Sequence, residues 1–409
     1  MTLEPAVLVP LHHKTRSRSE PPPGFAPKRG EAQFGLARFV IGEVHVRTIV
    51  MVAVVTIAAC TTPPPPDPLS KHSATVEESK ALVPTPPWSE GDERGMGNTQ
   101  SGGTRLRCAF HLADPRAKQY ELSQLRSDTM PVSPFGVPLD YTFRATAGLP
   151  GTKHAFNGET VSGEPAAQGT QMDALGHFAY LTEAWDGSGS LPEDQVRYYS
   201  GFTQAEVKPS PDSPLLKLGI EQVPPIITSA VLLDARSFLG GGEPLEAGRL
   251  ITARDIEVMI EAQGLAWRGL LPGDVLYIYT GWEDYWDDPD ERKIYYTKGP
   301  GLSYDAAQYI GDKAVVLVGL DNPFTDPVSD GQLVGQAPPP EGTPNGLPFV
   351  IHHHNLTQSG IHQIQNAHLE EMAADKVWTS CTIILPLRIR GGSGSAVRPV
   401  AFGVPQAQE

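Results

Sequence analysis

Residues 251–282 read ITARDIEVMIEAQGLAWRGLLPGDVLYIYTGW and predict a helix followed by a buried strand. Thr252 and Asp255 form a capping box at the start of the helix. Apolar residues then recur at helical spacing until Gly264, a residue that commonly ends a helix. Residues 275–280 form a short run of Val, Leu, Ile and Tyr, which is typical of a buried strand.

The same alternation continues on both sides of this stretch. Further apolar runs of strand length cover residues 230–233, 314–320 and 382–389. Additional helices are predicted to begin after Ser303 and to cover about 366–377. Strands that alternate with helices indicate the α/β class, with a mixed sheet, flanking helices and a single domain.

The N-terminal part of the chain has the composition of a targeting segment. Residues 48–59, TIVMVAVVTIAA, are uncharged, follow Arg47 and precede Cys60. This run is too short to cross a bilayer, which takes about 20 apolar residues, and has the length of a signal-peptide core. The ending IAAC is similar to a bacterial lipobox, which implies lipidation at Cys60. We therefore expect a lipoprotein anchored in the bacterial envelope, in the outer membrane facing the periplasm.

Three regions follow from this pattern. Residues 1–59 are expected to be a signal-peptide region whose long N-terminal extension is not part of the translated or mature chain, with translation starting at Met51 or a codon upstream of it. Residues 60–105 are rich in Pro, Ser, Gly and charge, which predicts a disordered tether. Residues 106–409 hold the folded domain.

The charge of the chain excludes one class of partner. The net charge is −15, and residues 1–59 carry seven Lys or Arg against four Glu, so the remainder has a net charge of −18. Nucleic-acid binding needs clustered basic residues, and we find no such cluster after the N-terminal segment. We expect a small-molecule substrate, no nucleic acid, a membrane contact through the lipid alone and a homo-oligomer.

Two further cysteines leave a choice open. In an exported protein Cys108 and Cys381 could form a disulfide. They could equally remain separate buried thiols, because Cys381 lies in a predicted core strand.

The segment with the clearest chemistry is residues 169–177, GTQMDALGH. Asp173 and His177 lie four residues apart and could converge on one metal ion or one substrate carbonyl. Taken alone, this spacing is more often a salt-bridged pair on a helix.

The segment also resembles a family motif. The cyclase family of metal-dependent hydrolases, which includes bacterial kynurenine formamidase, carries H-x-G-T-H-x-D-x-x-x-H, and this chain fits it from Gly169 onward. Segments similar to the family follow in order along the chain: VLLDAR, PGDVLYIYTGW, GPGLSYDAAQYI, VVLVGLDN and LPLRIRGGSGSAVRPVAF.

This resemblance implies a swivelling β/β/α-type fold and hydrolysis of an amide, lactam or ester bond at divalent zinc or manganese, as in an arylformamidase. It assigns Asp173 as a bridging ligand, His177 as the general base and His353 as a later metal ligand.

The chain departs from the motif at three ligand positions. Ala167 and Gln171 replace the first two histidines, and Gln365 replaces a glutamate. Alanine cannot bind a metal, and a neutral glutamine oxygen suits zinc poorly. Three hypotheses remain open. One metal could be held by Asp173 and His353 with some of His177, Gln171, Gln365 or a neighbour in the histidine run 352–354. Asp173 and His177 could instead form a metal-free acid/base pair, or the chain could be a ligand-binding lipoprotein that has lost the chemistry.

Two further groups are candidates. Trp282, Tyr285 and Trp286 could form an aromatic substrate pocket, although ordinary loop packing explains them equally well. In the run 352–354 of three histidines, an extended backbone would point only the first and third to one side, and two of the three would face solvent.

Overall fold

The computed structural model describes Ser70 and residues 73–406. The signal-peptide and lipidation predictions at residues 48–60 lie outside these residues. In the described part no helix is long and apolar enough to span a membrane.

A mixed sheet of nine strands forms the centre of the described chain, in the order β1, β15, β13, β7, β9, β11, β12, β4, β14. Neighbours from β7 to β12 run parallel, and the outer pairs run antiparallel. The strands of this sheet are β1 (Lys118–Glu121), β4 (Gln171–Asp173), β7 (Ile226–Asp234), β9 (Val275–Tyr279), β11 (Leu317–Leu320), β12 (His362–Gln365), β13 (Thr379–Ile384), β14 (Gly394–Ala396) and β15 (Val400–Gly403).

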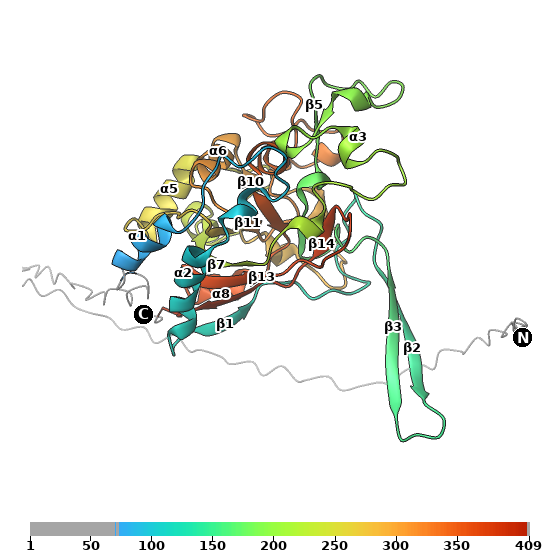
Figure 1. Cartoon of the computed structure of the whole chain (residues 1–409), viewed down its shortest axis with the longest axis horizontal. Helices are drawn as coiled ribbons and strands as arrows, with labels where there is room; N and C mark the ends of the chain where they lie inside the picture. The colour runs from blue at the N-terminus through green and yellow to red at the C-terminus, as the bar shows by residue number, and fades with distance from the viewer. Residues whose placement is uncertain (1–69, 71–72, 407–409) are drawn as a thin grey trace, which may run out of the picture. The chain divides into compact units, whose positions relative to one another are not determined.

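Helices flank this sheet (Figure 1). The α-helices are α1 (Ser73–Ala81), α2 (Gly102–Ala113), α3 (Gln204–Val207), α4 (Ala235–Leu239), α5 (Ala253–Ala262), α6 (Tyr304–Asp312), α7 (Val350–His352) and α8 (Glu370–Ala374). The remaining strands form three hairpins or short pairs: β2 (Asp140–Gly148) with β3 (Ala155–Ser162), β5 (Tyr180–Leu181) with β6 (Val196–Arg197), and β8 (Leu250–Ile251) with β10 (Gly301–Leu302).

Local signals placed most of the predicted elements correctly. Thr252 caps α5 in a capping box with Asp255, and Ser303 caps α6. The strands predicted at 230–233, 275–280 and 314–320 correspond to β7, β9 and β11. The mixed α/β fold is confirmed.

The predicted tether is wrong from residue 73 onward. Residues of α1 and α2 fold onto the body, and Met96 between them belongs to the main hydrophobic core. Polar and Gly-rich composition concealed this packing, because the segment reaches the core through close backbone approach: Gly95 lies against Gly360, where a Cβ atom would clash with the backbone.

A buried ionic cluster joins α2 to the sheet. Asp274, just before β9, accepts hydrogen bonds from Arg107 of α2 at 3.3 Å and from Arg268 at 2.8 Å. All three side chains are fully buried. Close by, Cys108 of α2 and Cys381 of β13 form a disulfide, which resolves the choice left open by the sequence.

Candidate active site

The site is built on two neighbouring strands. β4 pairs with β12 so that Gln171 lies opposite Gln365. Side chains alternate along a strand, so Gln171 and Asp173 face one side of the sheet while Met172 between them is fully buried in the core. Gln363 and Gln365 share a face of β12 by the same alternation.

Two glutamines hold the Asp173 carboxylate. Gln363 Nε2 donates to Asp173 Oδ2 at 2.9 Å, and Gln365 Nε2 donates to the same oxygen at 2.7 Å. A carboxylate can only accept here, so both amides have a fixed orientation. Asp173 Oδ1, Gln171 Oε1 and Gln365 Oε1 are left buried without a hydrogen-bond partner among the described residues. These three oxygens are the free acceptors of the site.

His352 faces the same carboxylate from α7. Its Nδ1 lies 2.5 Å from Asp326 Oδ2, and its Nε2 lies 3.6 Å from Asp173 Oδ2. The Asp326 carboxylate also accepts from the backbone amide of Ile351 at 2.5 Å. Burial lowers the pKa of His352, but the charges of Asp326 and Asp173 outweigh burial, and the pKa is raised above its ordinary value. The imidazole is therefore fixed at Nδ1, while Nε2 faces Asp173 and lies 3.4 Å from Gln365 Nε2.

These groups open into a cavity of about 240 Å³, which we call the site cavity. Aromatic rings form much of its wall, and the ring centroids of Phe135 and Phe324 lie 6.1 Å apart. The lining residues are Ser133, Phe135, Ala167, Gln171, Asp173, His177, Phe178, Tyr296, Pro323, Phe324, Phe349, His352 and Gln365. The cavity combines a polar end at Asp173 with an apolar wall, as small-molecule sites do.

Most of the predicted site residues converge here. Gln171, Asp173, His177 and Gln365 all line the site cavity, together with Ala167. His177 is exposed in a short 3₁₀ helix. Gln365 lies almost 200 residues after the other three in the sequence, and the fold brings it next to them.

His353 does not line this cavity, and its neighbour His352 takes the place expected for it. The reason is local: residues 350–359 form α7 and a π-helix, not an extended segment. His353 Nδ1 instead lies 3.2 Å from Thr357 Oγ1, and its ring packs against Tyr180. All three consecutive histidines are buried, so the prediction that two face solvent is wrong.

The residues predicted to form an aromatic substrate pocket lie outside the site cavity. Trp282, Tyr285 and Trp286 are absent from the lining of the site cavity. Trp282 is buried, and its ring lies tilted against Tyr285 with the ring centroids 4.6 Å apart. Its Nε1 donates to the Tyr295 carbonyl oxygen. The alternative reading, loop packing, describes this group.

Comparison with known proteins assigns the family. The Cyclase family model matches residues 79–327, more than half of the chain. The chain belongs to the cyclase family.

Individual members of the cyclase family differ in how much of the chain they match. A kynurenine formamidase of Bacillus cereus is 31% identical over 101 residues, which is 25% of this chain and 39% of that protein. A kynurenine formamidase of Bacillus anthracis is 30% identical over the same length. A solved structure of a novel cyclase is 26% identical with a TM-score of 0.62, covering 79% of this chain and 98% of that one. The chain thus spans about two fifths of the curated relatives and almost all of the solved cyclase.

The residues present do not fit the zinc or manganese site implied by the cyclase-family motif. No group of three His, Cys, Asp or Glu side chains suited to a metal occurs within the described ranges. Ala167 offers no donor atom, and Asp173 Oδ2 already accepts from two amides. His352 Nδ1 is engaged by Asp326. These side chains offer few negative charges and few nitrogen atoms as metal ligands, and zinc prefers both.

Sequence reasoning missed Gln363 and Asp326, and it gave His352 only as an alternative to its neighbour His353. Gln363 and Gln365 lie two residues apart on the same face of β12. Because side chains alternate along a strand, the position of Gln363 could have been predicted from that of Gln365. His352 could be told from His353 only once the backbone was known to be helical. Asp326 follows no motif, and the fold alone brings it to His352.

Proposed function

We propose that this chain is a hydrolase of the cyclase family that cleaves an amide, lactam or ester bond of an aromatic substrate in the site cavity. One observation carries the proposal: His352, fixed by Asp326 at Nδ1, presents its Nε2 to the same cavity as Asp173. A carboxylate-bound imidazole beside a second carboxylate is an arrangement suited to general acid/base chemistry.

His352 acts in this proposal as the base. Its Nε2 accepts a proton from a water molecule that attacks the scissile carbonyl carbon. Asp326 holds the Nδ1–H tautomer and stabilises the imidazolium that forms. Because the site does not fit zinc or manganese, no step passes through a metal.

Asp173 and His177 position and protonate the substrate. Gln363 and Gln365 hold Asp173 so that its free Oδ1 can accept a hydrogen bond from a substrate N–H or from the attacking water. His177, exposed in the cavity wall, delivers a proton to the leaving nitrogen or oxygen.

The cavity and the relatives together suggest the substrate class. A volume of about 240 Å³ is small for a ligand site and suits a single aromatic ring against Phe135, Phe324 and Phe349. The curated relatives are kynurenine formamidases. We therefore propose N-formyl aryl amines of the N-formylkynurenine type as the first substrates to test.

The decisive experiment measures hydrolysis of an aryl formamide, an aryl lactam and a phenyl ester by the purified full-length chain. His352→Gln and Asp173→Asn are each expected to lower kcat by about 10²-fold or more. His354→Gln is the matched control, because His354 is equally buried but bonds Asn355 and Ser359 outside the cavity. Loss of activity with a chelator and its return with manganese would overturn the metal-free mechanism.

A ligand-binding protein without chemistry is the second candidate. Two features favour it. Ala167 contributes no polar group to the cavity, and the amides of Gln363 and Gln365 already occupy Asp173 Oδ2, so that fewer groups near Asp173 are free to react. In this case aryl formamides would bind to the native chain, and Asp173→Asn would weaken binding, while no formate is released at any pH.

We also propose that the protein is a lipoprotein of the bacterial envelope, on the basis of residues 48–60. Palmitate labelling of the full-length chain, with Cys60→Ser as the control, tests this location. Label on the Cys60→Ser variant, or none on the native chain, would contradict it.

A further inference from the structure

Three oxygen atoms at the polar end of the site cavity are buried and have no hydrogen-bond partner among the described residues. They are Asp173 Oδ1, Gln171 Oε1 and Gln365 Oε1. Asp173 and Gln365 are each 1% exposed, and all three residues line the site cavity. A buried acceptor without a donor costs free energy, so these atoms favour a ligand that supplies donors. The polar end of the cavity is therefore matched to N–H or O–H groups of a ligand.

The contacts of Asp173 Oδ2 fix the orientation of two of these acceptors. Gln365 Nε2 donates to Asp173 Oδ2 at 2.7 Å, so the free atom of the Gln365 amide is its oxygen and not its nitrogen. Gln363 Nε2 donates to the same carboxylate oxygen at 2.9 Å and leaves Asp173 Oδ1 free. Two adjacent groups, joined by a hydrogen bond, thus each keep one free oxygen beside the cavity.

The buried charge around these oxygens is negative. Asp173 supplies one carboxylate, and Asp326 supplies a second one behind His352. A protonated His352 would offset only one of the two. Among the described residues no Lys or Arg lines the cavity, and His177 in its wall is exposed to solvent. The polar end therefore favours a cation over a neutral group or an anion.

Arg126 is a buried cation near this region, but it is engaged elsewhere. Its Nη1 donates to the Pro165 carbonyl oxygen at 3.0 Å, and its Nη2 donates to the Thr170 carbonyl oxygen at 2.6 Å. Arg126 is absent from the lining of the site cavity. It holds the backbone that leads into β4 and makes no ion pair with Asp173.

Aromatic rings surround the polar end and favour a flat cation. The ring centroid of Phe178 lies 5.5 Å from that of His352, and the centroid of Phe349 lies 6.1 Å from it. Aromatic faces attract cations, and a delocalised planar cation loses less hydration on burial than an ammonium does. Such a cation also carries paired N–H donors, which suit two adjacent acceptors.

We propose that the polar end of the site cavity binds a cationic nitrogen group, an amidinium or a protonated amine, that is attached to an aromatic ring. Its N–H groups donate to Asp173 Oδ1 and Gln365 Oε1, and the ring lies against Phe178 and Phe349. This inference rests on the proposed function, because it assigns the ligand of the same cavity: the substrate is an aryl amide or ester that carries such a nitrogen. The cation of the ligand then balances the charge of Asp173, which the cyclase-family motif assigns to a metal.

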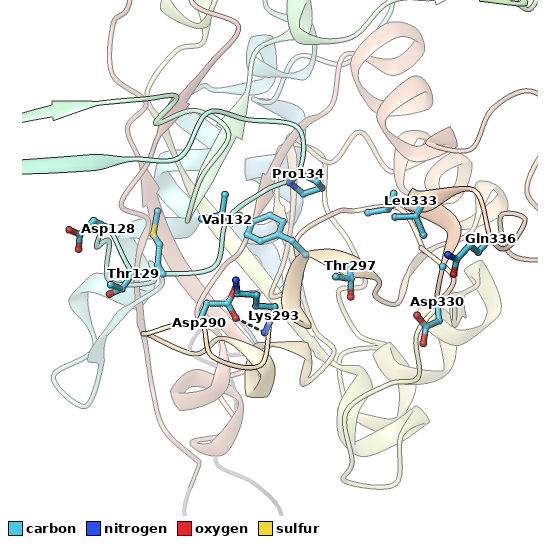
Figure 2. Close-up of a pocket in the computed structure, with 14 residues that line it drawn as sticks. Asp128, Thr129, Val132, Pro134, Asp290, Lys293, Thr297, Asp330, Leu333 and Gln336 are labelled. Atoms are coloured by element: carbon cyan, nitrogen blue, oxygen red, sulfur yellow. Dashed lines mark hydrogen bonds between the residues drawn. The ribbon is translucent and has the colours of Figure 1, made fainter.

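A neighbouring groove carries other carboxylates and provides the control. It has a volume of about 660 Å³, with Asp128 and Asp330 on opposite sides (Figure 2). Asp330 is already paired with Lys298 at 2.7 Å, and Lys293 lies in the lining of the groove. Asp128 is exposed to solvent. A cation gains less beside these solvated or paired carboxylates than beside the buried Asp173.

Isothermal titration calorimetry of the full-length chain with benzamidine tests the proposal without turnover. The benzamidinium cation should bind at least about tenfold more tightly than benzamide, a neutral molecule of nearly the same shape, because its hydrogen bonds are charge-assisted. Benzoate should show no binding. Asp173→Asn should bring the two dissociation constants to about the same value. Asp128→Asn makes the same charge change in the groove and should leave both constants as they are.

A second variant tests the neutral acceptor. Gln365→Met keeps the size of the side chain but removes Oε1, and it should weaken benzamidine binding by about threefold or more, since one hydrogen bond is lost. The preference for benzamidine over benzamide should persist in this variant, because Asp173 is still present. The comparison of ligands on the native chain holds even if a variant fails to fold.

Two results would overturn the proposal: equal affinity of the native chain for benzamidine and benzamide, or a benzamidine affinity that falls in Asp128→Asn and not in Asp173→Asn. The proposed hydrolase is judged separately. Selective benzamidine binding by a chain that releases no formate would retain the cation site and remove the hydrolase. Hydrolysis of aryl formamides without any preference for the cation would do the reverse.

Discussion

The Nδ1 atom of His352 donates to Asp326 Oδ2 at 2.5 Å, although the two residues lie 26 positions apart. The pair links α7 to the segment after β11, and it decides which ring nitrogen of His352 remains available to the cavity.

Replacing Asp326 by asparagine should therefore lower hydrolysis by about 10²-fold, because the imidazole loses both its tautomer restraint and its stabilising charge. The pKa of His352 should fall, since Asp326 is the main group that raises it. The acid limb of the kcat profile should move to lower pH. Asp212→Asn, an exposed carboxylate elsewhere, is the control. An unchanged rate and profile would remove His352 as the base.

Restoring the three family ligands should create a metal site. The variant Ala167→His, Gln171→His and Gln365→Glu is expected to bind about one zinc per chain or more, because it adds two imidazoles and a carboxylate beside Asp173. The native chain should bind no stoichiometric zinc. Elemental analysis after dialysis measures both. Stoichiometric zinc in the native chain would show that the glutamines are ligands after all.

The stability of the protein should fall as pH rises through neutrality because of Asp321. Burial raises the pKa of this carboxyl to about 7, and the charge of Glu283 adds to the effect. Its pKa in the unfolded chain is about 3.9. The native state thus holds a proton that the unfolded state has released, so this contribution is full below about pH 4 and is lost as the pH passes 7.

The variant Asp321→Asn should flatten this dependence. Urea unfolding at pH 5 to 8 should show a smaller loss of unfolding free energy in the variant than in the native chain or in Asp212→Asn. Equal slopes in all three proteins would assign the pH dependence to other groups.

Removing Asp274 should destabilise the fold severely. Asp274→Ala leaves Arg107 and Arg268 as buried cations without their carboxylate, which typically costs about 3–5 kcal/mol. The loss should appear as a lower midpoint in urea. The exposed ion pair of Arg254 and Glu257 provides the comparison, because Glu257→Ala should cost less than about 1 kcal/mol. A similar cost for both variants would contradict this account.

The elements that could be predicted are those whose signals are local. Caps at Thr252 and Ser303 act within one helical turn, and buried strands such as β9 are continuous apolar runs. Both signals can be recognised in the sequence without knowing the fold. The same holds for the segment around Asp173, which resembles the family motif together with similar segments that follow in order along the chain.

What could not be predicted depends on contacts between distant segments. The backbone conformation at 350–359 decides which histidine faces Asp173, and three identical residues give no pattern to separate them. The β2–β3 hairpin could not be predicted, because an alternation of polar and apolar residues is the same whether a face is buried or solvated. Composition alone predicts a tether at residues 73–105, because it does not reveal packing through glycine contacts.

The Cys108–Cys381 disulfide closes a covalent ring around almost the whole domain, including the β2–β3 hairpin. A protease that cuts the exposed turn of this hairpin, between Leu149 and His154, would therefore produce two polypeptides that remain one molecule. Such a nicked protein should migrate as a single band without reductant and as two bands with it. The effect of a cut in the hairpin could then be distinguished from the effect of losing the fold.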